Sequence, residues 1–190
     1  EIAELRKAGH AIDAVHAQVP QLLQAGRTEA EVAHELEKLI LQEHSVIDFV
    51  IVGSGPNGAN PHHSFSDRVL AEGEPVVVDI GGTLPSGYHS DCTRTYVVGG
   101  DISTAPQDFQ DAYAVLADAQ AAARAAAHPG STAADIDAIT RQAISAAGWG
   151  DYFVHRTGHG IGLSTHEEPF IMEGNDLALE EGMAFSIEPG

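Results

Sequence analysis

The sequence repeats one unusual pattern, an apolar stretch that follows a Glu-Gly pair and carries a single carboxylate. The stretch EGEPVVVDIGG places Asp79 in this pattern, and EGMAFSIEPG places Glu188 in it. A carboxylate within an apolar strand is costly to bury without a partner, so a cation or hydrogen bonds must compensate it. We therefore expect each strand to deliver its carboxylate to a polar site.

The repetition extends upstream of both strands. AGRTEAEVAHELEKLI aligns with PGSTAADIDAITRQAI at a nearly constant offset, which pairs Thr28 with Thr132 and Glu31 with Asp135. Thr28 and Glu31 have the spacing of a helix N-terminal capping box, and Thr132 is expected to cap the corresponding helix of the second half. The chain is therefore predicted to consist of two related halves whose carboxylate-bearing strands meet at a pseudo-symmetric centre. The period is too long for a solenoid.

Composition restricts the class of partner. The chain has 190 residues, 43% of them hydrophobic, which is ordinary for one soluble globular domain spanning 1–190. A net charge of -19 opposes binding to nucleic acid or to an anionic membrane surface, and it favours small substrates and metal cations. Cys92 is the only cysteine, so an intramolecular disulfide is excluded and we expect a cytoplasmic protein.

Hydrophobic periodicity and turn residues predict the same order of elements in each half, helices followed by strands. This order indicates an α+β domain. Helices are expected over 2–22 with an interruption at Pro20, after Thr28, over 106–127 and after Thr132, and strands over 47–52, 76–80, 88–98 and around Met183.

The predicted hairpin carries two aspartates, Asp79 on one arm and Asp91 on the other. Directly opposed side chains of an antiparallel pair lie close together, so these carboxylates either share a proton or share cations. A simpler interpretation makes them turn residues with solvated side chains. Cys92, next to Asp91, points to the opposite face of the strand and is expected to pack in the core.

Three histidines follow the second predicted helix pair, and the glycines of GHGIG surround the central one. His155 and His159 are expected to point the same way in an extended segment, with His166 opposite or beyond a bend. The glycines allow other strands or a ligand to approach His159 closely. Oxygen ligands with a single imidazole favour Mn²⁺, Co²⁺, Fe²⁺ or Mg²⁺.

Five ordered motifs together resemble those of the pita-bread metallopeptidases, and more narrowly the proline-specific Xaa-Pro dipeptidases (prolidases) and Xaa-Pro aminopeptidases. The resemblance covers the whole chain. It implies an α+β pita-bread fold, with two pseudo-symmetric halves and helices packed on a curved, mainly antiparallel sheet. The motifs are NGANPHH, VVVDIGG, YHSDCTRTYVVG, HRTGHGIGLSTHEEP and FSIEPG.

The resemblance also implies a dinuclear centre with two divalent metal ions, Mn²⁺ or Co²⁺ by preference. Four of its five protein ligands correspond to Asp79, Asp91, His159 and Glu188. The fifth ligand is a glutamate on a strand that would follow Gly190. We therefore expect a catalytic domain without its last strands and without the N-terminal domain that is common in proline-specific members.

The resemblance assigns roles to the remaining histidines. His62 and His166 are expected to contact the substrate or to stabilise the tetrahedral intermediate, and His155 to shape the pocket on the proline side of the scissile bond. Glu188 is expected to act also as general base in a metal-assisted hydrolysis. The expected substrates are small peptides with proline at the second position. The alanines of 121–127 belong either to the core or to an interface, and on an exposed helix face they would suggest a homodimer.

Three alternatives remain open at this point. A methionine aminopeptidase-like exopeptidase uses the same fold, and His155 argues against it. A noncatalytic peptide-binding module and a creatinase-like hydrolase without metals are also compatible with the fold, and the retained ligand residues argue against both.

Overall fold

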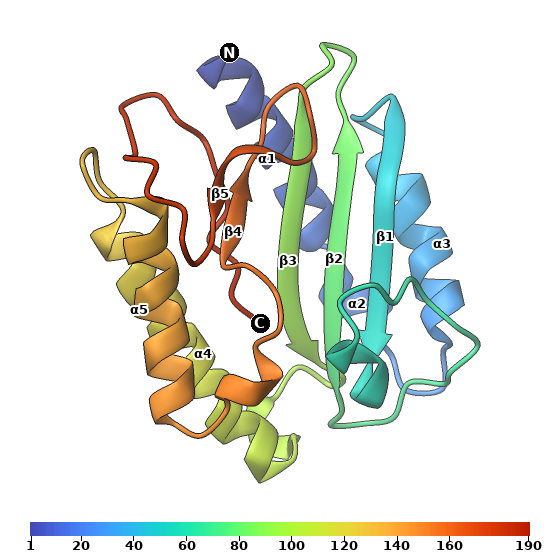
Figure 1. Cartoon of the computed structure of the whole chain (residues 1–190). Coiled ribbons are helices and arrows are strands. Elements are labelled where there is room, and N and C mark those ends of the chain that lie inside the picture. Colours follow the sequence, from blue (N-terminus) through green and yellow to red (C-terminus); the bar gives the residue numbers. More distant parts are fainter. The chain divides into compact units, whose positions relative to one another are not determined.

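The chain divides into two units, Glu1–Phe109 and Gln110–Gly190, in a computed structural model that describes residues 1–190 (Figure 1). The boundary lies between the two aligned helical segments of the repeat, 25–40 and 129–144. None of the helices has the length and apolar character needed to cross a membrane.

The first unit is built on a three-stranded antiparallel sheet in the order β1-β2-β3 (Figure 1). Val76, Val78 and Ile80 of β2 are fully buried, and they form one core with apolar side chains of α1 and α3. The opposite face of β2 carries Asp79. The elements are α1 (Ile2–His16), α2 (Val19–Leu22), α3 (Glu29–Ile40), β1 (Val46–Ser54), the 3-10 helix η1 (Gly55–Ala59), β2 (Pro75–Thr83), β3 (His89–Val97) and η2 (Ile102–Thr104).

The first predicted helix is interrupted near its end, as expected, but the break lies just before Pro20 and not at it. Helix α1 ends at His16, and α2 begins at Val19 with Pro20 in its first turn. A proline is tolerated there because the first N–H groups of a helix have no intrahelical partner. The proline therefore starts a short helix where we expected it to interrupt a long one.

The second unit packs two helices against a two-stranded antiparallel sheet. Ala123 of α4 and Ile136 of α5 are fully buried in one core with Ile171 of β5. The elements are α4 (Gln107–Ala126), which begins just before the boundary, α5 (Ala133–Ala146), η3 (Gly150–Tyr152), β4 (Gly158–Gly160) and β5 (Glu167–Ile171).

The strand predicted around Met183 is absent as a regular strand. The chain from Ala184 to Glu188 instead forms one isolated antiparallel bridge, between Phe185 and Gly160 of β4. Backbone hydrogen bonds from Ser186 to His159 (2.8 Å) and from Glu188 to Thr157 (2.7 Å) extend this pairing. The segment is thus extended, as predicted, and it lies beside β4, but its pairing is too sparse for a full ladder.

The capping box predicted at Thr28 is present, and Thr132, predicted as a helix cap, forms a second box with Asp135. Thr28 accepts from the Glu31 backbone N–H at 3.1 Å, and the Glu31 side chain accepts from the Thr28 N–H at 2.9 Å. Thr132 and Asp135 repeat this exchange at 3.1 Å in both directions. Each box satisfies two N–H groups that the helix leaves unpaired, so these four residues start α3 and α5.

The same two threonines tie each helix start to a distant segment. Thr28 forms an isolated antiparallel bridge with Val69, and Thr132 forms one with Ala178. The two halves therefore also share a pattern of backbone pairing, which the sequence alignment alone does not reveal.

Candidate metal centre

Asp79 and Asp91 lie on the same face of the first unit's sheet, but they are not directly opposed. Asp79 of β2 pairs with Thr93 of β3, and Asp91 pairs with Gly81. The two carboxylates are therefore diagonal neighbours, for which a Cα separation of about 7–8 Å is typical. Thr93 donates a hydrogen bond of 2.7 Å from Oγ1 to Oδ1 of Asp79.

The hairpin turn explains this register. Leu84 and Tyr88 close the turn with a backbone hydrogen bond of 2.8 Å, and Gly87 adopts a φ of 87° within it. Thr83 is consequently paired with His89. The spacing of the two aspartates was visible in the sequence, but the turn that sets their pairing was not.

Cys92 occupies the opposite face of β3, as predicted. Its side chain packs against the core shared by β2 and the helices of the first unit. Burial raises the pKa of the thiol to about 11. A thiol protonated at neutral pH is a poor metal ligand, so Cys92 is a packing residue.

His159 and Glu188 form a close pair in the second unit. His159 lies on β4 with a side chain only 3% exposed, and its Nε2 lies 3.0 Å from Oε1 of Glu188. Its Nδ1 donates to the carbonyl of Gly160 at 3.0 Å, since a carbonyl can only accept. A metal ion that took the place of the proton between Nε2 and Glu188 would therefore bind the Nε2 lone pair, the arrangement usual for a metal-binding histidine.

The pair fits a divalent cation. Ligand bonds of about 2.0–2.2 Å place two neighbouring ligand atoms of one ion roughly 3 Å apart. His159 Nε2 and Glu188 Oε1 have this separation. One nitrogen and one carboxylate oxygen therefore converge where an ion could bind both.

Glu188 is held in its ionised form. Burial alone raises the pKa of this carboxyl, but the hydrogen bond and charge of His159 and the hydrogen bond from Ser186 outweigh it and lower the pKa. Ser186 Oγ donates to Glu188 Oε1 at 2.8 Å. A metal ligand must be deprotonated, and Glu188 meets this condition.

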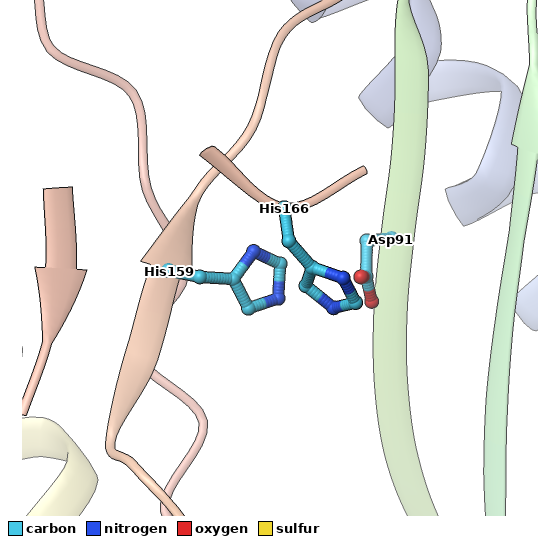
Figure 2. Close-up of side chains that lie close together, drawn as sticks. All are labelled: Asp91, His159 and His166. Atoms are coloured by element: carbon cyan, nitrogen blue, oxygen red, sulfur yellow. The ribbon is translucent and has the colours of Figure 1, made fainter. Parts of the chain in front are cut away.

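His166 lies beside His159 in the second unit. The chain reverses direction between β4 and β5, and the two rings meet edge to face with centroids 4.2 Å apart (Figure 2). This agrees with the expectation that His166 lies beyond a bend. Burial, followed by the charges of His159 and Arg156, lowers the pKa of His166. Figure 2 also labels Asp91 on β3 of the first unit.

The other two predicted histidines occupy different surroundings. His155 is partly exposed, its ring meets that of Phe153 edge to face at 5.2 Å, and its Nδ1 donates to the carbonyl of Arg156 at 2.7 Å. His62 is exposed in the loop after η1, where its backbone N–H donates to Asn60 Oδ1 at 3.0 Å. His62 belongs to the unit with the two aspartates, and His155 to the unit with His159.

Two buried carboxylates near these segments were missed in the sequence. Glu29 of α3 is fully buried, and Asp137 of α5 is 1% exposed. Each lies on the apolar face of its helix, one turn from a buried apolar residue, Val32 for Glu29 and Ala133 for Asp137. A charge at an apolar position of the 3.6-residue period was the available signal.

The chain has the α+β pita-bread architecture of a class of metallopeptidases. Within that class, the chain belongs to metallopeptidase family M24, whose sequence model matches residues 3–190. The family assignment confirms the resemblance drawn from the five motifs, and it establishes metal dependence as the family's chemistry.

Similar proteins include dipeptidases and prolidases. The chain is 59% identical over 191 residues to a probable dipeptidase PepE of Mycobacterium tuberculosis, covering 100% of this chain and 50% of the relative. It is 42% identical over 194 residues to an Xaa-Pro dipeptidase of Lactobacillus delbrueckii subsp. lactis, covering 100% of this chain and 51% of that protein. The chain thus spans about half the length of these relatives.

Solved structures agree with this assignment. Dipeptidase PepE from Mycobacterium ulcerans matches with a TM-score of 0.94 and 56% identity, over 100% of this chain and 50% of that one. Prolidase from Pyrococcus furiosus matches with a TM-score of 0.93 and 38% identity, over 100% of this chain and 55% of that one. The pita-bread fold predicted from the sequence is confirmed.

Proposed function

We propose that the protein containing this chain hydrolyses Xaa-Pro peptide bonds in a metal-dependent reaction, as a dipeptidase or an Xaa-Pro aminopeptidase. The observation that carries the proposal is the pairing of His159 Nε2 with the ionised carboxylate of Glu188 at 3.0 Å. The printed names of the relatives, dipeptidase and Xaa-Pro dipeptidase, support the substrate class. Residues 1–190 would belong to the catalytic domain.

Asp79, Asp91, His159 and Glu188 would hold two divalent ions, Mn²⁺ or Co²⁺. Three carboxylates and one imidazole match the preference of these ions for oxygen ligands with few nitrogens. Bound ions of this kind lower the pKa of water and polarise a peptide carbonyl.

The chain's own residues would orient the substrate and move the proton. Glu188, kept ionised by its hydrogen bonds, would accept a proton as general base. His62 and His166 are both exposed, so each is free to contact a peptide. His155, which is partly exposed, would shape the pocket on the proline side of the scissile bond.

The remaining assignments concern place and assembly. We propose that the protein acts in the cytoplasm, which its single cysteine supports, and that small peptides are its partners, to the exclusion of nucleic acid and membranes. The homodimer stays a prediction. Ala123 is buried in the core, whereas Ala121 and Ala122 on the same helix are exposed and available to a second copy.

The first experiment measures Mn²⁺-dependent hydrolysis by the full-length protein. Ala-Pro, Ala-Pro-Ala and Met-Ala-Ser would be compared. Proline release from Ala-Pro alone identifies a dipeptidase, and removal of alanine from Ala-Pro-Ala identifies an Xaa-Pro aminopeptidase. Cleavage confined to Met-Ala-Ser would identify the methionine-specific alternative, and bound metal without hydrolysis would identify a binding module.

Asp91→Ala tests the metal ligands. We expect the variant to lose metal binding and turnover while its helix content by circular dichroism stays unchanged, because Asp91 lies on a sheet face away from the helix-packed core. Asp118→Ala, on the exposed side of α4, is the matched control and should behave like the natural protein. Undiminished turnover in Asp91→Ala would contradict the dinuclear proposal.

A further inference from the structure

Two charged side chains one helical turn apart on α5 form a fork-to-fork ion pair. Arg141 Nε donates to Asp137 Oδ2 at 2.8 Å, and Arg141 Nη2 donates to Asp137 Oδ1 at 3.0 Å. The Asp137 side chain is 1% exposed, and that of Arg141 is 31% exposed. Such bidentate pairs fix the direction of both groups.

This ion pair binds the backbone that leads into β4. Arg141 donates to the carbonyl of Phe153 at 3.2 Å and to that of His155 at 3.0 Å. Asp137 Oδ1 accepts from the N–H of Thr157 at 3.3 Å and from its hydroxyl at 2.7 Å. The contacts fall on every second residue, so the pair follows the chain as a neighbouring strand would.

Further hydrogen bonds connect this backbone to the residues of the candidate metal centre. Thr157 accepts the backbone N–H of Glu188 at 2.7 Å, and His159 follows Thr157 by two residues on the same extended chain. Thr157 therefore connects Asp137 to Glu188, because it is hydrogen-bonded to both. His155 and His159 lie on either side of the residue that Asp137 holds.

We propose that Asp137 and Arg141 are positioning residues, a clamp that sets the backbone of His155, His159 and Glu188 for metal binding. The inference rests on the proposed metal site. A buried ion pair is weak as a source of stability, because well-packed apolar residues often stabilise a protein as much. Its hydrogen bonds to four backbone or hydroxyl groups, in contrast, set the position of a defined stretch of chain.

The first unit contains a corresponding device. Glu29 of α3 accepts from the N–H of Ser54 at 2.7 Å and from its hydroxyl at 2.6 Å. Asp137 receives the same two donors from Thr157. In both units a buried helix carboxylate binds the N–H and hydroxyl of one residue, but from different helix positions, since the alignment that pairs Thr28 with Thr132 places Asp137 opposite Ala33.

The test uses two variants of the full-length protein, Asp137→Asn and Arg141→Lys. The second is milder, because lysine keeps the positive charge but cannot form the bidentate hydrogen bonds of the guanidinium group. Mn²⁺ affinity would be measured by calorimetry. Loss of a group that orients metal ligands typically lowers affinity or activity by about 10- to 100-fold, and we expect a loss of this size for Asp137→Asn. Leu36→Ala, in the core of the first unit, is the control for general loss of stability.

Hydrogen exchange of the metal-free protein gives a second readout. The amides of Thr157, His159 and Glu188 should exchange faster in both clamp variants, while those of α3 stay protected. This readout needs neither metal nor turnover. If the natural protein fails to bind Mn²⁺, the proposed function is refuted, and the hydrogen-exchange rates still test whether the ion pair holds this backbone.

Two results would overturn the clamp. One is unchanged exchange at Thr157, His159 and Glu188 in Asp137→Asn. The other concerns Mn²⁺ affinity. If Asp137→Asn and Leu36→Ala lower the melting temperature equally and also lower Mn²⁺ affinity equally, the ion pair has only a structural role.

Discussion

Replacing Glu29 with glutamine should destabilise the first unit strongly and in a pH-dependent manner. The Glu29 carboxylate is fully buried and accepts hydrogen bonds from five donors. These are the N–H (2.7 Å) and Oγ (2.6 Å) of Ser54, Oγ of Ser66 (2.7 Å), Nε2 of His63 (2.8 Å) and Nδ2 of Asn57 (3.0 Å). A glutamine amide would turn one acceptor oxygen into a donor facing these donors.

The magnitude follows from the pKa of Glu29. Burial raises the pKa, but hydrogen bonds from Ser54, Ser66 and Asn57 outweigh it and lower the pKa from 4.5 to about 2. By linkage, this shift corresponds to about 3 kcal/mol of unfolding free energy at pH 7. Because the folded carboxyl binds its proton less readily than the unfolded one, this stabilisation is complete above pH 4.5 and is lost as the pH falls towards 2.

Urea unfolding of the full-length protein, followed by circular dichroism, would measure the effect. We expect Glu29→Gln to cost about 3 kcal/mol at pH 7 and roughly half of that at pH 3, where the natural protein has itself lost part of the stabilisation. Glu31→Gln, the same change two residues along α3, loses only the exposed side of a capping box and should cost about 1 kcal/mol or less. Equal costs for the two variants, or a cost for Glu29→Gln that does not change with pH, would refute this reasoning.

Two further predictions concern single positions. In Gly158→Ala the new methyl group would collide with the carbonyl of Ser186, so β4 should separate from the Glu188 segment at a cost of about 1–3 kcal/mol and with weaker Mn²⁺ binding. Gly9→Ala is the control, since nothing lies near its Cβ position within α1, and melting curves that match for the two variants would contradict the prediction. Cys92, with its thiol pKa raised to about 11, should react with a disulfide reagent at pH 8 only after unfolding in urea, and rapid labelling of the folded protein would show that the thiol is accessible.

Local interactions explain why the helices were predictable. Thr28 with Glu31 and Thr132 with Asp135 start α3 and α5 where the capping pattern placed them, because the bonds that define a capping box join residues three apart. The apolar run around Asp79 likewise identified β2, and the structure buries Val76, Val78 and Ile80 on the face opposite the carboxylate. These signals lie within one turn or one strand, so they need no tertiary information.

The predictions that the structure corrected all depend on how separate segments of the chain pair with each other. The sequence placed Asp79 and Asp91 directly opposite each other, and the turn at 84–88 made them diagonal instead. The final segment was expected as a strand, but its pairing with β4 produced one bridge. Which partner a strand finds, and in which register, is decided by turn geometry and packing.

By itself, the sequence determined the two related halves, the capped helices, the carboxylate-bearing strands and the family to which the chain belongs. Periodicity, caps and motifs are written in neighbouring residues, and this is why they could be recognised. Only the tertiary structure showed that Asp137 binds Thr157 and that His159 Nε2 faces Glu188. Twenty or more residues separate the members of each pair, and a long-range hydrogen bond between buried polar groups forms only once the surrounding core has excluded water from both.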